Sequence, residues 1–156
     1  VGQSMPPRQA GGQPLHPICP HVSIKGDCRV IPTPAQRNVL FKAFSQALSA
    51  RDMEALYGVV TPDFRWSYHD GISVTKLLAG AGPIIEHLAG QKALFSSQRF
   101  HEIAYHHLPE MTFMTMRVSE TVRATGAQRE QRGVECYTFK DSKIATKDVY
   151  RKPIEI

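Results

Sequence analysis

Residues 34–50 form the first long periodic stretch of the sequence, because apolar side chains recur there at the spacing of helical turns. This pattern predicts an amphipathic helix that packs one side against a core. Thr33 and Pro34 suit its start, since threonine is a good N-cap and proline is favoured at the first helical position. The apolar positions are Val39, Leu40, Ala43, Phe44, Ala47 and Leu48.

The pattern continues with shorter elements after this helix. Residues 51–60 predict a second helix, and residues 61–64, which contain a proline, predict a break after it. Residues 64–70 alternate and predict a strand, and residues 82–95 predict a third helix. The inner side of the second helix would carry Met53, Leu56, Val59 and Val60.

The second half of the chain has the alternation that is typical of strands. Four strands are predicted, over residues 98–108, 111–125, 129–139 and 144–151. Three helices followed by a strand meander predict an α+β fold, in which the helices pack on one face of a curved antiparallel sheet.

The last two predicted strands form a hairpin, GVECYTFKDSKIATKDVYRK, over residues 133–152. Glu135, Tyr137 and Phe139 share one face of the first strand. In the second strand, Asp148 and Tyr150 share one face and Lys147 and Arg151 share the other. A face that places Glu135 beside two aromatic side chains favours a lined cavity over a dry core. An ordinary hairpin with one solvent-exposed face remains the alternative.

Residues 1–34 differ in composition from the rest of the chain. They hold most of its 11 prolines and are rich in glycine and glutamine. Such a stretch cannot sustain a helix and has few apolar residues to bury. We therefore expect a proline- and glycine-rich arm or linker over residues 1–34 and one folded domain over residues 35–152.

The distribution of charge and the length of the apolar stretches argue against two kinds of partner. The net charge is +5 and the pI is about 9.3, but the basic residues are dispersed and do not alternate with aromatic residues. This dispersal argues against nucleic-acid binding. No apolar stretch approaches the roughly 20 residues that a membrane-spanning helix needs, so no membrane partner is expected.

The three cysteines are relevant to the cellular compartment in which the protein would work. Cys136 lies in a predicted strand, as a small core residue would. Cys19 and Cys28 could close a disulfide loop in a secreted or periplasmic protein, or be free thiols in the cytoplasm, which we favour. His16 and His21 stand near them, but the spacing matches no standard zinc motif, so no metal or other cofactor is expected.

Three segments of the chain resemble a known family. They are FSQALSARDMEALYGVVTPDFRW, GPIIEHLAG and the closing hairpin GVECYTFKDSKIATKDVYRK, and the similarity covers about residues 35–152. They resemble the nuclear transport factor 2-like superfamily, in particular its bacterial SnoaL-like branch. The resemblance implies a cone-shaped half barrel with helices closing one side and a pocket inside. Ketosteroid isomerase, scytalone dehydratase, limonene epoxide hydrolase and polyketide cyclases share that shape, as do non-enzymatic binding and assembly domains.

The resemblance also permits a test of one mechanism. Aligned by these segments, ketosteroid isomerase would need a tyrosine at Phe44 and a base at Tyr68, and only Glu135 keeps a carboxyl group at the late acid position. Phe44 has no hydroxyl group to donate. The sequence therefore excludes steroid isomerisation by the known mechanism.

Three residues are candidates for proton transfer. Asp70 follows Trp66 and Tyr68 on one face of the first strand, although Asp70-Gly71 also suits a turn. Glu135 is a mid-strand carboxyl group that would need a partner such as Arg117 or Tyr68 if it were buried. His101 could act as acid or base, or be a structural strand histidine.

Aromatic residues supply the candidate ligand wall. We expect Trp66, Tyr68 and Tyr137 to line the pocket, with Arg117 and Tyr150 as polar ligand contacts. The leading hypothesis is a pocket for a hydrophobic or aromatic small molecule, with cofactor-independent isomerase, dehydratase or cyclase chemistry. The alternative is a non-catalytic binding or assembly domain that acts through protein–protein contacts.

A homodimer is expected as well. The family resemblance is its main basis. The second basis is that Phe113, Met114 and Met116 would place apolar side chains on both sides of their strand. The dimer would form through the open face of the sheet.

Overall fold

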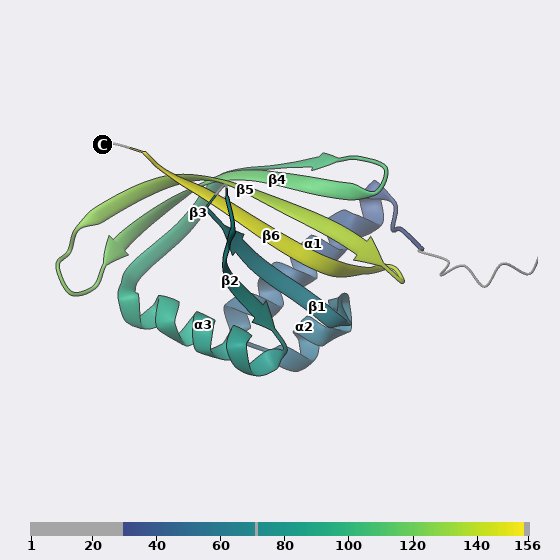
Figure 1. The fold of residues 1–156 in the computed structure, drawn as a ribbon, viewed down its shortest axis with the longest axis horizontal. Helices are drawn as coiled ribbons and strands as arrows, with labels where there is room; N and C mark the ends of the chain where they lie inside the picture. The colour runs from purple at the N-terminus through teal and green to yellow at the C-terminus, as the bar shows by residue number, and fades with distance from the viewer. Residues whose placement is uncertain (1–29, 71, 155–156) are drawn as a thin grey trace, which may run out of the picture.

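The computed structural model describes residues 30–70 and 72–154. Cys19, Cys28, His16, His21 and most of the expected arm lie outside these residues. The described chain has three α-helices and six β-strands (Figure 1). The helices are α1 (Pro34–Ala50), α2 (Met53–Val59) and α3 (Ala81–Leu94). The strands are β1 (Val60–His69), β2 (Val74–Ala79), β3 (Phe95–His107), β4 (Met111–Val122), β5 (Gln128–Lys140) and β6 (Lys143–Ile154).

Helix α1 begins where the sequence predicts. The Thr33 side chain accepts from the backbone of Gln36, and the Gln36 side chain accepts from the backbone of Thr33, which makes a capping box. The buried stripe keeps the predicted Phe44 and Ala47, but Val39 is 69% exposed and Phe41 is buried instead. Its members are Arg37, Phe41, Phe44 and Ala47.

Arg37 is the unexpected member of that stripe. Its guanidinium group is 2% exposed and donates to the carbonyl oxygens of Pro32, Leu108, Pro109 and Met111. It also donates to the hydroxyl of Thr112 at 3.2 Å. One buried cation therefore connects the start of α1 with the β3–β4 turn.

Strand β1 corrects two expectations about the first half. Helix α2 ends at Val59, before the predicted break at residues 61–64, but these residues already belong to the strand, because β1 begins at Val60 rather than at residue 64. Its ladder with β6 is irregular between Val60 and Arg65, and this interval contains Pro62, which has no N–H to donate. Strand β2 was not predicted, and it forms an edge of the sheet with Leu78 as its one buried residue.

The sheet is mixed rather than purely antiparallel. Its order is β2-β1-β6-β5-β4-β3, and β1 runs parallel to β6 while every other pair is antiparallel. The sheet is not closed, because β2 and β3 form its two edges. Helix α3 follows β1 and β2 in the chain, so only α1 and α2 precede the sheet.

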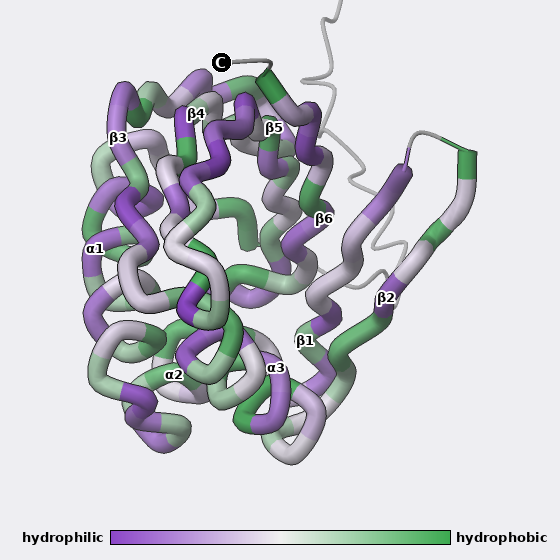
Figure 2. The backbone as a smooth tube through the Cα atoms, turned by 90° about the vertical axis from the view of Figure 1, so that its left-hand side faces the viewer, coloured by the Kyte–Doolittle hydropathy of each residue, from purple (hydrophilic) through white to green (hydrophobic). Residues whose placement is uncertain are grey.

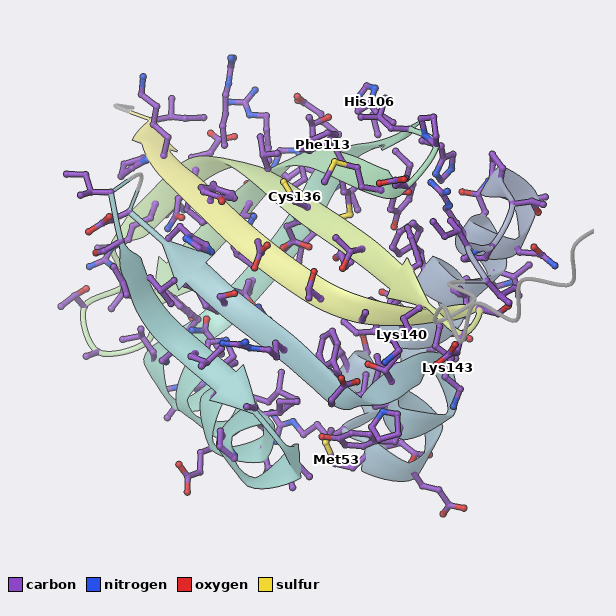
Figure 3. All side chains as sticks on the ribbon, turned by 45° about the vertical axis from the view of Figure 1, so that its right-hand side comes forward. Met53, His106, Phe113, Cys136, Lys140 and Lys143 are labelled. Atoms are coloured by element: carbon purple, nitrogen blue, oxygen red, sulfur yellow. The ribbon has the colours of Figure 1, made fainter. Side chains whose placement is uncertain are left out.

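The helices and the sheet form two layers. The sheet curves strongly, and the three helices lie on its concave side (Figure 1). Along β4, alternate residues are buried on that side, including Met114 and Met116. Figure 3 shows Phe113 and Cys136 on the opposite side of the sheet. Of the three residues cited for a dimer, only Phe113 therefore faces outward.

The end of the β1–β2 hairpin stands apart from the helices (Figure 2). Ile72 at this end is 97% exposed.

None of the helices in the described part of the chain combines the length and the apolar character that crossing a bilayer requires.

Candidate functional site

A cavity of about 600 Å³ lies between the concave face of the sheet and helices α1 and α3. It is partly open to solvent, and a volume of this size is typical of small-molecule sites. The predicted wall residues Trp66, Tyr68 and Tyr137 all line it. Helix α1 adds Phe41 and Phe44, so this part of the wall is aromatic.

Glu135 is the buried acid of this cavity. Its side chain is 1% exposed; Oε1 lies 2.9 Å from Nη2 of Arg151, and Oε2 lies 3.0 Å from Nζ of Lys147. The Tyr137 hydroxyl also donates to Oε2. Burial alone would raise the pKa of Glu135, but Lys147, Arg151 and the Tyr137 hydrogen bond together lower it below its ordinary value. Glu135 is therefore a carboxylate at neutral pH.

Lys147 lies between this carboxylate and the aromatic wall. Its Nζ is 4.3 Å from the ring centroid of Trp66 and 5.4 Å from that of Phe44. Burial lowers the pKa of Lys147, and the adjacent carboxylate of Glu135 opposes this effect. The contact at 3.0 Å favours a carboxylate–ammonium pair, with the ammonium over the face of the indole.

A second polar group is formed by Tyr68, His87 and Lys76. The Tyr68 hydroxyl lies 2.9 Å from Nε2 of His87, and Nδ1 of His87 lies 3.2 Å from Nζ of Lys76. An ammonium can only donate, so Nδ1 accepts, and Nε2 carries the proton of a neutral imidazole. Burial, followed by the charges of Lys76 and Lys147, lowers the pKa of His87 to about 4.

This tautomer frees the hydroxyl proton of Tyr68. Because His87 donates to the Tyr68 oxygen, the Tyr68 hydroxyl can donate to a ligand in the cavity. Burial raises the pKa of Tyr68, so the hydroxyl keeps its proton at neutral pH. The His87 ring lies 5.2 Å from Trp66 and the Tyr68 ring 5.9 Å from it, centroid to centroid. The indole of Trp66 therefore has polar groups on two sides.

A further carboxyl group lines the cavity at some distance. Glu120 is 7% exposed and accepts from the amides of Gln98, at 2.7 Å, and Gln131, at 3.2 Å. It stands six positions along β4 from Met114, the residue paired with Glu135. At about 3.3 Å per residue, the path along the strand is about 20 Å.

The other four predicted site residues do not line the cavity. Asp70 is at the exposed end of the β1–β2 hairpin, where its carboxylate accepts from the backbone N–H groups of Ser73 and Ile72. These hydrogen bonds lower the pKa of Asp70. The side chain thus has the turn geometry that the Asp-Gly pair suggests.

His101, Arg117 and Tyr150 lie on the outer face of the sheet. His101 contacts the hydroxyl of Ser119 at 2.8 Å, and Arg117 pairs with Glu130 at 2.8 Å. Tyr150 stacks on His69, with centroids 4.8 Å apart. The structure therefore brings Glu135, Trp66, Tyr68 and Tyr137 together and leaves these three on the other side.

Residues that sequence reasoning did not single out supply much of the site. They are Lys147, Arg151, His87, Lys76 and Glu120. The one available signal was the alternation of β6, which places Lys147 and Arg151 on a common face. No group of three or more His, Cys, Asp or Glu side chains suited to a metal ion occurs among residues 30–70 and 72–154.

The fold and cavity define an α+β protein with helices on the concave side of a curved sheet. The model of the SnoaL-like domain matches residues 41–147, and the chain belongs to this family. A search of the curated proteins found no match.

Solved structures agree with this assignment. A nuclear transport factor 2-like protein from Burkholderia xenovorans is 16% identical, with a TM-score of 0.64 over 77% of this chain and 92% of that chain. TerC, co-crystallized with polyporic acid, is 16% identical, with a TM-score of 0.60 over 73% of this chain and 89% of that one. A putative polyketide cyclase from Xanthomonas campestris is 13% identical, with a TM-score of 0.61 over 74% and 90%. Identities this low establish a shared fold and leave activity to be argued from the site.

Proposed function

We propose that the curved sheet and its helices form a cone-shaped site for a hydrophobic or aromatic small molecule. We further propose that the site catalyses cofactor-independent proton transfer, as an isomerase, dehydratase or cyclase would. The observation that carries the proposal is the cavity of about 600 Å³ with aromatic wall residues, into which a buried carboxylate and a neutral imidazole–phenol pair both face. TerC, of the same fold, was co-crystallized with polyporic acid, which supports a small-molecule site in this fold.

The chemistry is that of an enolisable ketone. The C–H bond beside the ligand carbonyl breaks, its electron pair forms the enolate, and the proton passes to the carboxylate of Glu135. The Tyr68 hydroxyl, oriented by His87, donates to the developing oxyanion. The lowered pKa of Glu135 makes it a weak base, so the proposal is restricted to ligands with acidic C–H groups.

Hydrogen–deuterium exchange of β-tetralone tests this proposal, because its C1–H bonds lie between the carbonyl and the fused aromatic ring and are acidified by both. In D₂O, the protein should speed the loss of the NMR signal from the protons beside the carbonyl. Tyr68→Phe should slow the exchange at least tenfold, within the usual range for a lost catalytic donor. Tyr150→Phe, on the outer face of the sheet, is the matched control and should exchange at the wild-type rate.

The same experiment separates the two candidate classes. If β-tetralone changes the fluorescence of Trp66 but its protons do not exchange faster than in buffer, the cavity binds without catalysing. That result would favour the non-catalytic binding domain. Trp66 is a specific reporter, because it is the single tryptophan of the sequence.

We also propose that two copies associate through the outer face of the sheet. This face carries the partly exposed side chains of Val134, 38% exposed, and Tyr150, 38% exposed, beside Phe113. Light scattering should then report twice the mass of 17.4 kDa, and Val134→Glu should reduce it to the monomer. A monomer for the wild type at high concentration would refute the dimer.

A further inference from the structure

We propose that the natural ligand of the cavity carries an anionic oxygen group, such as an aromatic carboxylate, that binds against Lys147 and Arg151 while its rings lie against the aromatic wall. The inference rests on the proposed function, because it specifies the ligand class of the same cavity. It depends on charge, whereas the proposed function depends on the aromatic wall and on proton transfer.

The first observation is an imbalance of charge at the cavity wall. Lys147 and Arg151 both contact Glu135, at 3.0 and 2.9 Å. Within residues 30–70 and 72–154, Glu135 is the single acid in ion-pair contact with either cation. Two positive charges therefore share one negative charge, and one positive charge is left without a partner.

The second observation is the burial of this group. The side chain of Lys147 is 8% exposed, and that of Glu135 is 1% exposed. A charge that is removed from water without a partner is unfavourable, and a second anion would relieve this cost. The excess positive charge therefore favours an anionic ligand over a neutral or cationic one of the same shape.

The third observation is that donors remain available. The ammonium of Lys147 has three N–H groups, and in the described part of the chain Glu135 is its one hydrogen-bonding partner. Around it stand the rings of Trp66, Phe44 and Tyr137, which offer no charged acceptor. A ligand oxygen beside Lys147 would accept a charge-assisted hydrogen bond, with its rings against the same aromatic wall.

Glu120, the other acid that lines the cavity, does not cancel the preference for an anionic ligand. Glu120 lies about 20 Å along β4 from the level of Glu135 and accepts from two glutamine amides. A planar ligand with its anionic group at Lys147 keeps that group away from Glu120. Arg129 also lines the cavity and is paired with Glu120 across β4 and β5, so the charge of Glu120 is balanced at that end and the excess positive charge lies at the Lys147 end.

Three naphthalene probes of one shape and different charge test the proposal. Naphthoate is the anion, naphthamide the neutral match and naphthylmethylamine the cation. Calorimetry should give naphthoate a dissociation constant at least about tenfold lower than that of naphthamide, with the amine weakest. Quenching of Trp66 fluorescence, corrected with N-acetyltryptophanamide, should locate naphthoate in the cavity.

Two lysine variants separate the cavity charge from the net charge of the protein. Lys147→Met should remove the preference for naphthoate over naphthamide and leave naphthamide binding in place. Lys152→Met, an exposed position on the same strand, removes the same charge outside the cavity and should keep the preference. The wild-type comparison of the three probes stands without the variants, should Lys147→Met fold poorly.

The outcomes also distinguish this inference from the proposed function. If naphthamide or the amine binds as tightly as naphthoate and quenches Trp66, the anionic ligand is wrong while the aromatic site stands. The inference is equally wrong if Lys152→Met abolishes the preference as fully as Lys147→Met. If none of the three probes binds, the aromatic site itself is refuted, and the inference with it.

Discussion

Gly133 on β5 lies directly beneath the guanidinium group of Arg151 on β6. The two residues are paired across the strands, and a Cβ atom at Gly133 would overlap Nη1 of Arg151. It would also approach the methyl group of Met116 to 3.0 Å. The absence of a side chain at Gly133 therefore makes the room in which Arg151 reaches Glu135.

Gly133→Ala should displace Arg151 and lower the free energy of unfolding by about 1–3 kcal/mol, the usual cost of overpacking. In an Arg151→Ala background, where the obstructing group is gone, most of this loss should disappear. Urea denaturation of the four proteins of this double-mutant cycle measures both values. Gly58→Ala in α2, where a Cβ meets nothing within 4 Å, is the control and should cost nothing. Equal losses in both backgrounds would show that Arg151 is not the obstruction.

Glu135→Gln should be destabilising by about 3 kcal/mol at neutral pH, because it leaves the buried Lys147 and the partly buried Arg151 without their carboxylate. The folded-state pKa of Glu135 is lowered from its ordinary 4.5, so the ionised form contributes stability above that value. This contribution is lost as the pH falls through the folded-state pKa, and the gap between wild type and variant should then narrow.

Urea denaturation at pH 7, 5 and 4 would measure that gap. The exposed residue Glu110 supplies the control, and Glu110→Gln should stay within about 0.5 kcal/mol of the wild type at each pH. A Glu135→Gln variant as stable as the wild type at pH 7 would mean that the ion pairs with Lys147 and Arg151 add nothing to stability.

Arg37→Met should destabilise the fold by about 3 kcal/mol or more. The variant leaves four carbonyl oxygens and the Thr112 hydroxyl without their donor at a buried position. Arg37→Lys should recover little of this loss, since one ammonium cannot reach acceptors that the planar guanidinium contacts from several sides. Thermal melts compare the stability of the two variants. A lysine variant with the melting temperature of the wild type would contradict a stabilising role for the guanidinium hydrogen bonds.

His87 should remain neutral down to about pH 5, because its folded-state pKa is lowered from 6.5 to about 4. The unfolded chain binds the proton first, so stability should fall as the pH drops through the interval between these values. NMR titration of the imidazole signals measures the pKa directly. His87→Gln should flatten the pH dependence of stability in that interval, whereas His106→Gln, at an exposed position, should keep it. Titration of the His87 signals near pH 6.5 would refute the buried neutral imidazole.

The predicted helices and the late strands are present because their local signals agree with their packing. The helix at residues 34–50 has both the capping residues and the apolar period. Strand β2 escaped prediction because five of its six positions are exposed, so it has no alternation to detect. The parallel pairing of β1 with β6 could not be predicted, because register between distant strands leaves no local pattern.

About half of the site residues could be predicted from the sequence. The others were missed because the strand pairing in the last hairpin shifts by one residue. Asp141 and Ser142 have φ of 51° and 60°, a two-residue turn that pairs Lys140 with Lys143. Continued without interruption, that register would place Asp148 and Tyr150 on the same face as Glu135. An irregularity between Thr138 and Phe139 shifts the pairing by one residue and turns Lys147 and Arg151 to this face. The alternation of β6 predicts the two faces but not which one lies inside.

The parallel contact of β1 with β6 also has a consequence for how the chain folds. It joins Ser67 and Asp148, which are 81 positions apart, on two strands that both lie inside the sheet. Strand β6 is the last of the six to leave the ribosome, so until it does, β1 has β2 as its one neighbour. Contacts of such long sequence separation slow folding. The nascent domain would therefore expose the inner edge of β1 throughout synthesis, and this edge is where a chaperone or a second nascent chain would pair.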